Sequence, residues 1–138
     1  MDEAVKTDWM DEASALNQYV AQLVGAKATA VIGREFEQGT IFIRQMLLPE
    51  PNSYVRGHGH NFGHTTYIVK GSALVLRMID GVLCKRTVSA GEWLYVEAGV
   101  EHAIIALEGG TLGHCIYSHR NHEGEVVPSY EGWTPAYV

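Results

Sequence analysis

The sequence predicts an all-β domain of antiparallel strands, a sandwich or barrel, with one helix near its N-terminus. From about residue 28 onward, the chain consists of short segments rich in β-branched and aromatic residues, separated by turn residues. Asp80 and Gly81 lie between two such segments, and this pair is typical of a two-residue type I′ hairpin. No helix-length pattern interrupts the series, which excludes a parallel sheet built from strand–helix–strand units.

Length and composition indicate a single domain spanning residues 1–138. The 46% hydrophobic content of this 138-residue chain is enough to form a core without disulfides, and Cys84 and Cys115 are expected to be free thiols. The net charge of −6 argues against nucleic acid or an anionic membrane surface as a partner. The first residues lack a signal-peptide pattern, and no apolar run is long enough to cross a bilayer. We therefore expect a cytoplasmic protein.

One helix is expected at about residues 8–24, with Thr7 or Asp8 as its N-cap and Gly25 at its end. Apolar residues recur there at spacings of three and four, which forms one stripe along a helix. The stripe comprises Trp9, Ala13, Leu16, Val20 and Leu23. It predicts a helix packed on its own domain, with docking to a partner as the alternative.

Nine strands are expected within the barrel, which is assigned to about residues 28–120. They are Thr29–Glu35, Thr40–Leu48, Ser53–His60, Thr65–Val69, Ala73–Ile79, Val82–Val88, Trp93–Val96, Ala103–Leu107 and Leu112–Ser118. The remaining residues, 121–138, form an aromatic and turn-rich tail, which is expected to lie across the sheet or on a neighbouring subunit.

A run of histidines is the most informative local pattern. His58 and His60 lie two positions apart, so a strand would place both on one face. Gly63 permits a tight turn that would aim His64 back toward them. Three imidazoles within this short run are typical of a transition-metal site, and a surface histidine cluster is the alternative. A second stretch, from Gly91 through a turn at Ala98 and Gly99, ends in His102.

These spacings resemble the two sequence motifs of the cupins, small β-barrels of jelly-roll topology. The first motif is matched by His58, His60, His64 and Gly71, and the second by Gly91, Gly99 and His102. The resemblance covers about residues 40–120 and is strongest to small single-domain cupins. Four positions depart from the motifs: Asn52, Glu97 and Ala106 replace glycine, proline and asparagine, and His64 replaces the usual glutamate.

The resemblance implies a cupin-like jelly-roll barrel that binds one divalent transition metal ion through His58, His60, His64 and His102. Four neutral imidazoles suit Fe, Mn, Ni, Cu or Zn, and they leave the site a formal charge of +2. This charge favours an anionic ligand and lowers the pKa of a bound water. A six-coordinate metal would keep two positions open for substrate, whereas a tetrahedral zinc would keep none. The resemblance also implies a homodimer.

We therefore expect a metal-dependent enzyme acting on a small-molecule substrate, foremost an oxidoreductase of the dioxygenase kind. The alternatives are a redox-neutral lyase, isomerase or hydrolase, and a non-enzymatic metal- or ligand-binding protein. His114 is a candidate acid–base group or support for the site, with a hydrogen-bonded core histidine as the alternative. Arg44 and Arg56 could orient a substrate carboxylate, but surface or ion-pair roles are favoured.

Overall fold

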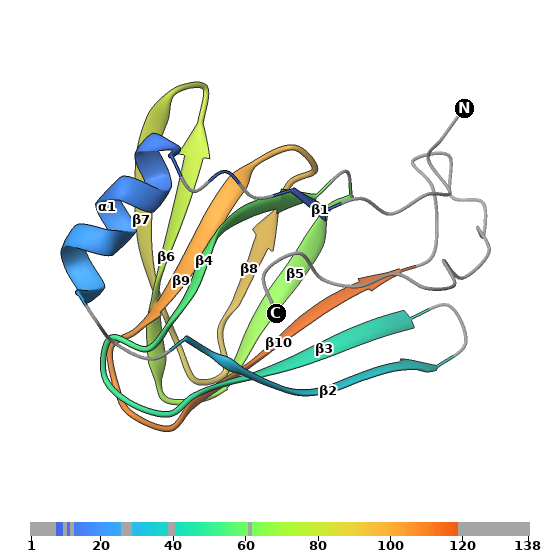
Figure 1. The fold of residues 1–138 in the computed structure, drawn as a ribbon. Helices are drawn as coiled ribbons and strands as arrows, with labels where there is room; N and C mark the ends of the chain where they lie inside the picture. Colours follow the sequence, from blue (N-terminus) through green and yellow to red (C-terminus); the bar gives the residue numbers. More distant parts are fainter. Residues whose placement is uncertain are drawn as a thin grey trace, which may run out of the picture.

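The computed structural model consists of two five-stranded β-sheets packed face to face, with one helix outside the first sheet (Figure 1). It describes residues 8–9, 11, 13–25, 29–38, 41–60 and 62–118. The aromatic tail expected at 121–138 lies outside these residues. Every strand pairing within the two sheets is antiparallel, which confirms the predicted fold class.

All nine expected strands form, and their ends differ from the predicted ones by a few residues at most. The first sheet contains, in spatial order, β1 (Asp8–Trp9), β4 (Tyr54–His60), β9 (Glu101–Ala106), β6 (Ser72–Ile79) and β7 (Val82–Ser89). The second contains β2 (Val31–Gln38), β3 (Ile41–Leu48), β10 (Thr111–Ser118), β5 (His64–Lys70) and β8 (Trp93–Val96).

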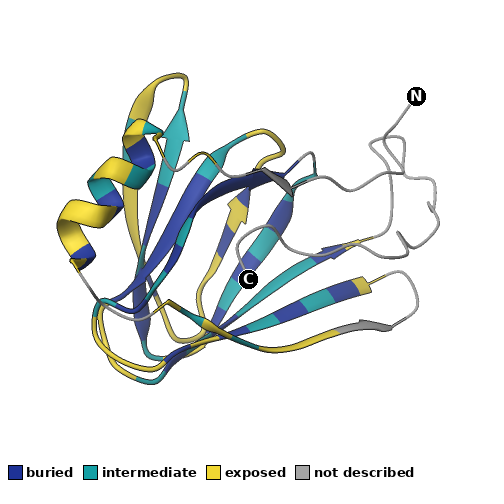
Figure 2. Cartoon of the chain, viewed as in Figure 1, coloured by how far each residue is buried: buried dark blue, intermediate teal, exposed yellow. Residues whose placement is uncertain are grey.

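Apolar side chains fill the space between the sheets over most of its length. The second sheet contributes Met46, Leu48, Ile68 and Leu94, and the first contributes Val55, Ala73, Val75, Val88, Ile104 and Ala106. Figure 2 shows the alternation of buried and less buried residues along β3 and β5 that such packing requires. Burial of each large aliphatic side chain contributes about 1.5–3 kcal/mol, so this interior holds the two sheets together.

The helix is shorter than the sequence predicts. Helix α1 spans Ala15–Val24 and begins after Ser14, whose Oγ accepts a hydrogen bond from the Asn17 amide at 3.1 Å. The predicted start near Asp8 is wrong because Asp8 and Trp9 pair instead with β4 as the edge strand β1. Gly25 ends the helix as expected. Within the described part of the chain, no helix has the length and apolar character needed to cross a membrane.

Helix α1 covers the outer face of the first sheet. Leu16, Val20 and Val24 are buried against Leu76, Ala103 and Ile105. The last residue of the apolar stripe is thus Val24, while the predicted Leu23 is 40% exposed. Because β9 is covered by the helix on one side and by the second sheet on the other, almost all of its residues are buried.

Two glycine positions illustrate how backbone geometry sets the turns. Asp80 and Gly81 have φ values of 51° and 78°, which confirms the predicted type I′ hairpin between β6 and β7. Gly71 has a φ of 84° between β5 and β6, and a Cβ there would overlap the side chain of Thr111 and lie 2.9 Å from its Cα. Gly71 is therefore constrained by both its backbone conformation and its surroundings.

Replacing these two glycines separates the two constraints. Both Gly71→Ala and Gly81→Ala should lose about 1–2 kcal/mol to the positive φ, but only Gly71→Ala adds a steric clash of about 1–3 kcal/mol. Gly81 is the matched control, because nothing lies within 4 Å of a Cβ built there. Chemical denaturation of both variants measures the difference, and equal losses would contradict the close packing of Gly71 against Thr111.

Candidate metal centre

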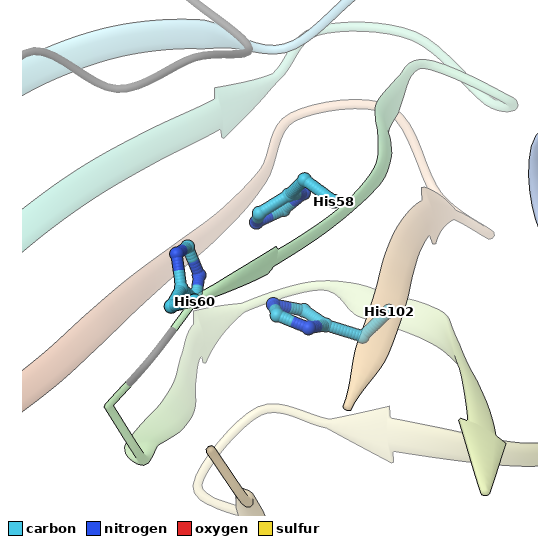
Figure 3. A group of neighbouring side chains, drawn as sticks. All are labelled: His58, His60 and His102. Atoms are coloured by element: carbon cyan, nitrogen blue, oxygen red, sulfur yellow. The ribbon is translucent and has the colours of Figure 1, made fainter. Parts of the chain in front are cut away.

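Three histidines from two neighbouring strands point toward one another inside the barrel. His58 and His60 lie on β4 and His102 lies on β9, and each offers a ring nitrogen within 4.8 Å of those of the other two (Figure 3). All three are almost fully buried, with at most 4% of their surface exposed. The structure thus brings together one residue of the second cupin motif and two of the first.

An irregularity in β4 is what directs His58 inward. Val55 pairs with Ile104 and His58 pairs with His102, so three steps along β4 correspond to two along β9. The extra residue shifts the alternation, since a regular strand would place residues three apart on opposite faces. Val55 and His58 therefore both face the interior, one in the apolar core and the other in the metal centre.

Asn17 of helix α1 holds this irregularity from outside the barrel. The amide N–H of Gly57 donates to Asn17 Oδ1 at 2.8 Å, and Asn17 Nδ2 donates to the Gly57 carbonyl at 2.9 Å. A Cβ at Gly57 would lie only 3.0 Å from Asn17 and Leu16, so a glycine lets the helix approach this closely. No pattern in the sequence predicts that a helical asparagine contacts the histidine strand.

Backbone carbonyls orient two of the histidine rings. His58 Nδ1 lies 2.7 Å from the Arg56 carbonyl oxygen, and His102 Nδ1 lies 2.8 Å from that of Val100. A carbonyl only accepts hydrogen bonds, so Nδ1 is the protonated nitrogen of both neutral rings. The lone pair is then on Nε2, which is the form in which an imidazole binds a metal.

His64 lies beside this cluster on β5 of the second sheet. Its ring centre is 5.1 Å from that of His60 and 5.0 Å from that of His102, and 2% of the residue is exposed. Neither ring nitrogen of His64 has a hydrogen-bond partner among the described residues. A buried polar group without a partner costs about 1–3 kcal/mol, and a bound metal ion would satisfy one of the two nitrogens. The donor set therefore fits a divalent transition metal.

Burial keeps these imidazoles neutral. Removal from water, and then the nearby His60, lower the pKa of His102 from 6.5 to about 3. The pKa values of His58 and His64 are also held well below 6.5, first by burial and then by the neighbouring His102 and His60. At neutral pH, protons therefore compete weakly with a metal for these three rings.

A small pocket with an empty volume of about 210 Å³, part of it open to solvent, adjoins the cluster. Its apolar lining comes from Phe42, Phe62 and Tyr117, and its polar lining from Arg44, His60 and His64. Arg44 is 3% exposed, and its Nε lies 2.7 Å from Glu35 Oε2, so the ion-pair role favoured from the sequence is confirmed. This buried guanidinium nevertheless faces the pocket.

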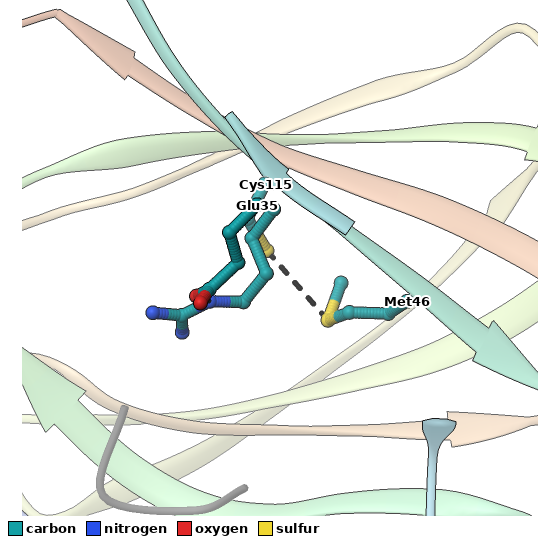
Figure 4. Close-up of polar contacts among 4 residues, drawn as sticks. Glu35, Met46 and Cys115 are labelled. Carbon is teal, nitrogen blue, oxygen red and sulfur yellow. Dashed lines mark hydrogen bonds and ion pairs between the residues drawn. The ribbon is translucent and has the colours of Figure 1, made fainter. Parts of the chain in front are cut away.

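Cys115 also lines the pocket, from the central strand of the second sheet. The Cys115 thiol lies 3.9 Å from the sulfur of Met46, and Figure 4 marks this contact with a dashed line. Glu35 is labelled in the same view. Cys84 and Cys115 are both half-buried, and neither forms a disulfide bond in the described part of the chain, as the sequence predicts.

His114 is not brought to the metal centre. It neighbours Cys115 and lies three residues before Tyr117, and both of these line the pocket, so alternation turns His114 to the outer face of its sheet. There its Nε2 lies 3.2 Å from Gln45 Nε2. Tyr95 is also on this outer face and is 56% exposed.

Comparison with solved structures identifies the fold. The chain is similar to an oxalate decarboxylase of Bacillus subtilis studied for its Mn(II) centres, with 26% identity, a TM-score of 0.53, and coverage of 57% of this chain and 21% of that one. A second structure of that enzyme, bearing a tryptophan-to-phenylalanine change, gives 23% identity and a TM-score of 0.59 over 67% of this chain and 26% of that one. The chain has the cupin jelly-roll fold.

The likeness extends to only part of these proteins. A third oxalate decarboxylase structure, studied for proton-coupled electron transfer, matches with 25% identity and a TM-score of 0.57 over 62% of this chain and 24% of that one. The chain thus spans about a quarter of the length of the structures it matches. No protein-family model and no curated protein sequence matches it.

Removing the His64 ring tests its part in the metal centre. His64→Ala should lower bound metal from about one ion per chain to well below half, because the other three histidines would be left with an incomplete donor set. Elemental analysis of untagged protein measures this, with His114→Ala as the matched control outside the cluster. Unchanged metal content in His64→Ala would rule out a fourth histidine ligand.

Asn17 should influence metal affinity without touching the metal. Asn17→Ala removes two hydrogen bonds to Gly57, worth about 1 kcal/mol each, and loosens the irregularity that aims His58. We expect metal affinity to fall about tenfold or more, measured by competition with a chelator. Gln18→Ala, on the exposed side of the same helix, is the control. Equal affinities in the two variants would contradict this coupling.

The metal-free protein should lose stability in mild acid. His102 has a pKa of about 3 when folded and about 6.5 when unfolded, so the unfolded state binds more protons between these values. The free energy of unfolding should be level above about pH 6.5 and fall as the pH drops toward 3. Urea denaturation at several pH values measures this slope, which should be shallower in His102→Gln. A slope unaffected by that change would show that another group is responsible.

Proposed function

We propose that this protein is a metal-dependent enzyme for a small organic anion, with the metal held by His58, His60, His64 and His102. The observation that carries the proposal is the buried histidine cluster beside a pocket with a guanidinium in its wall. Ring nitrogens of His58, His60 and His102 lie within 4.8 Å of one another. The fourth, His64, is supported as a ligand by its position and by its two ring nitrogens without hydrogen-bond partners.

Arg44 favours a negatively charged substrate. Its guanidinium is ion-paired with Glu35 through Nε and also lines the same pocket wall as His64, where its charge is the smallest of the causes that lower the pKa of that histidine. A metal held by neutral imidazoles keeps its full charge as well, so a carboxylate or enolate is attracted from both sides. The aromatic rings of Phe42, Phe62 and Tyr117 exclude water around the ligand and strengthen this attraction.

The reaction we favour is an oxidation of the dioxygenase kind. A divalent transition metal bound here would supply Lewis acidity and, if it is Fe, Mn, Ni or Cu, access to redox chemistry. Among the described residues that line the pocket, none carries a carboxylate that could serve as a general acid or base. The protein's own contribution would be to orient an anionic substrate through Arg44 and to keep the site dry.

A redox-neutral reaction is the second candidate. It is supported by the solved structures that the chain resembles, which are of an oxalate decarboxylase. Oxalate is a small dianion, and a carboxylate of that size would suit the small pocket beside the cluster better than a drug-sized ligand would. In this case the metal would act as a Lewis acid on the bound carboxylate.

One experiment separates these reactions. Protein reconstituted with Fe, Mn, Ni, Cu or Zn is mixed with oxalate, small β-dicarbonyl compounds and phenols, and both oxygen uptake and CO₂ release are followed. Oxygen uptake that depends on a redox-active metal supports the dioxygenase. CO₂ release without net oxygen uptake supports the decarboxylase-like lyase. Metal binding with neither activity would overturn the proposal of an enzyme for these substrate classes and favour a binding protein.

Arg44 provides a test of substrate charge. Arg44→Gln should raise the KM for an anionic substrate about 10- to 100-fold, because a charge-assisted hydrogen bond contributes about 1.5–3 kcal/mol. Arg44→Lys should recover part of the loss, and metal content should stay unchanged in both variants. Steady-state kinetics with elemental analysis measures this, and an unchanged KM in Arg44→Gln would remove the guanidinium from substrate binding.

A further inference from the structure

Arg77 of the first sheet lies in line with two of the candidate metal ligands. It is directly opposite His102 in the pairing of β6 with β9, and His102 is in turn opposite His58 of β4. Residues that face each other across an antiparallel pair point to the same side of the sheet, with Cβ atoms about 5 Å apart. The three side chains therefore form one row across the sheet, on the side that faces the interior of the barrel.

Packing along β6 supports this direction of the Arg77 side chain. Val75, two positions earlier, is buried in the core between the two sheets. Leu76 and Met78, the chain neighbours of Arg77, belong instead to the cluster beneath helix α1. Because side chains alternate along a strand, Arg77 shares the side of Val75. It is half-buried there, next to the histidine cluster.

The buried part of Arg77 has no polar partner among the described residues. Its Nε is shielded from solvent and makes no hydrogen bond. None of the described residues forms an ion pair with its guanidinium. A buried donor on a charged group is unfavourable when it has no acceptor, so nearly all such groups in proteins are satisfied. The position of Arg77 therefore indicates an acceptor that the described part of the chain does not supply.

The strands next to Arg77 offer no carboxylate on the interior side. Strands β6 and β7 contain neither aspartate nor glutamate. Glu101 of β9 is opposite Met78, so it lies on the helix side of the sheet. Arg86 of β7 is opposite Val75, so a second cationic residue begins on the interior side, where it is exposed. The two arginines make this edge of the site positively charged, and such an edge attracts anions.

We propose that Arg77 binds a second carboxylate of the substrate, so that the site takes a small dicarboxylate with one end at the metal and the other at Arg77. This inference rests on the proposed function, in which an anionic group of the substrate binds the metal. A guanidinium presents paired N–H donors that match the two oxygens of a carboxylate. Arg44 already shares its charge with Glu35, whereas Arg77 has no such partner among the described residues. Since Arg77 and His102 are directly opposite each other, a short carbon chain suffices to join the two carboxylates.

Ligand binding to the metal-loaded protein tests this proposal. Manganese- or zinc-loaded protein is titrated calorimetrically with malonate, succinate and the monocarboxylate propionate, and metal content is checked after each titration. We expect one of the dicarboxylates to bind at least tenfold more tightly than propionate, because a second charge-assisted contact forms. Arg77→Gln should abolish this preference and leave propionate affinity and metal content unchanged. Arg77→Met, which keeps an apolar stem without the charge, should give the same result, and Arg77→Lys should recover part of the preference. Circular dichroism confirms the fold of each variant.

Lys85→Gln is the matched control, with the same change in charge. Lys85 lies in the same hairpin but opposite Leu76, on the helix side of the sheet, and its Nζ is 5.0 Å from the ring centre of Tyr19. This variant should keep the preference for the dicarboxylate. Propionate binding without any such preference, or a preference that survives Arg77→Gln, would overturn the role of Arg77 and leave the proposed function intact. If the metal-loaded protein bound no carboxylate at all, both proposals would be wrong.

Discussion

The contact between Asn17 and Gly57 is the constraint on which the metal centre depends. A regular β4 could not face the core with Val55 and the cluster with His58, because these residues are an odd number of positions apart. The irregularity solves this conflict but leaves backbone groups of β4 turned toward α1. Asn17 satisfies both groups of Gly57, so the helix that covers the first sheet also maintains the geometry of the site on its far side.

The metal centre continues the hydrophobic core. Along β3, the inward-facing Leu48 and Met46 pack in the hydrophobic core, and the inward-facing Arg44 and Phe42 line the pocket beside the histidines. The site therefore inherits the low dielectric of the core. This explains why burial is the largest cause of the lowered pKa values of His58, His64 and His102. A buried charge without a partner is unfavourable in such an interior, and Arg44 is accordingly paired with Glu35.

The two sheets differ in what covers them. The first sheet has its own helix, and the burial of Leu16, Val20 and Val24 completes its second layer. The second sheet has no equivalent helix among the described elements. A domain of this size gains much of its stability by burying sheet faces, and α1 provides this burial for the outer face of the first sheet.

The strands, the type I′ hairpin at Asp80 and the candidate ligand positions could be predicted from the sequence alone, because they depend on local periodicity, turn geometry and motif spacing. Local patterns could not separate the edge strand at Trp9 from the helix that follows, because both fit one apolar stripe and only pairing with β4 distinguishes them. Likewise, the burial of Arg44 beside the histidines and the outward direction of His114 follow from the register of β3 and β10. Tertiary structure decided these points because side-chain direction reverses with each one-residue shift in register, and the shift in β4 is held by a contact 40 residues away in the chain.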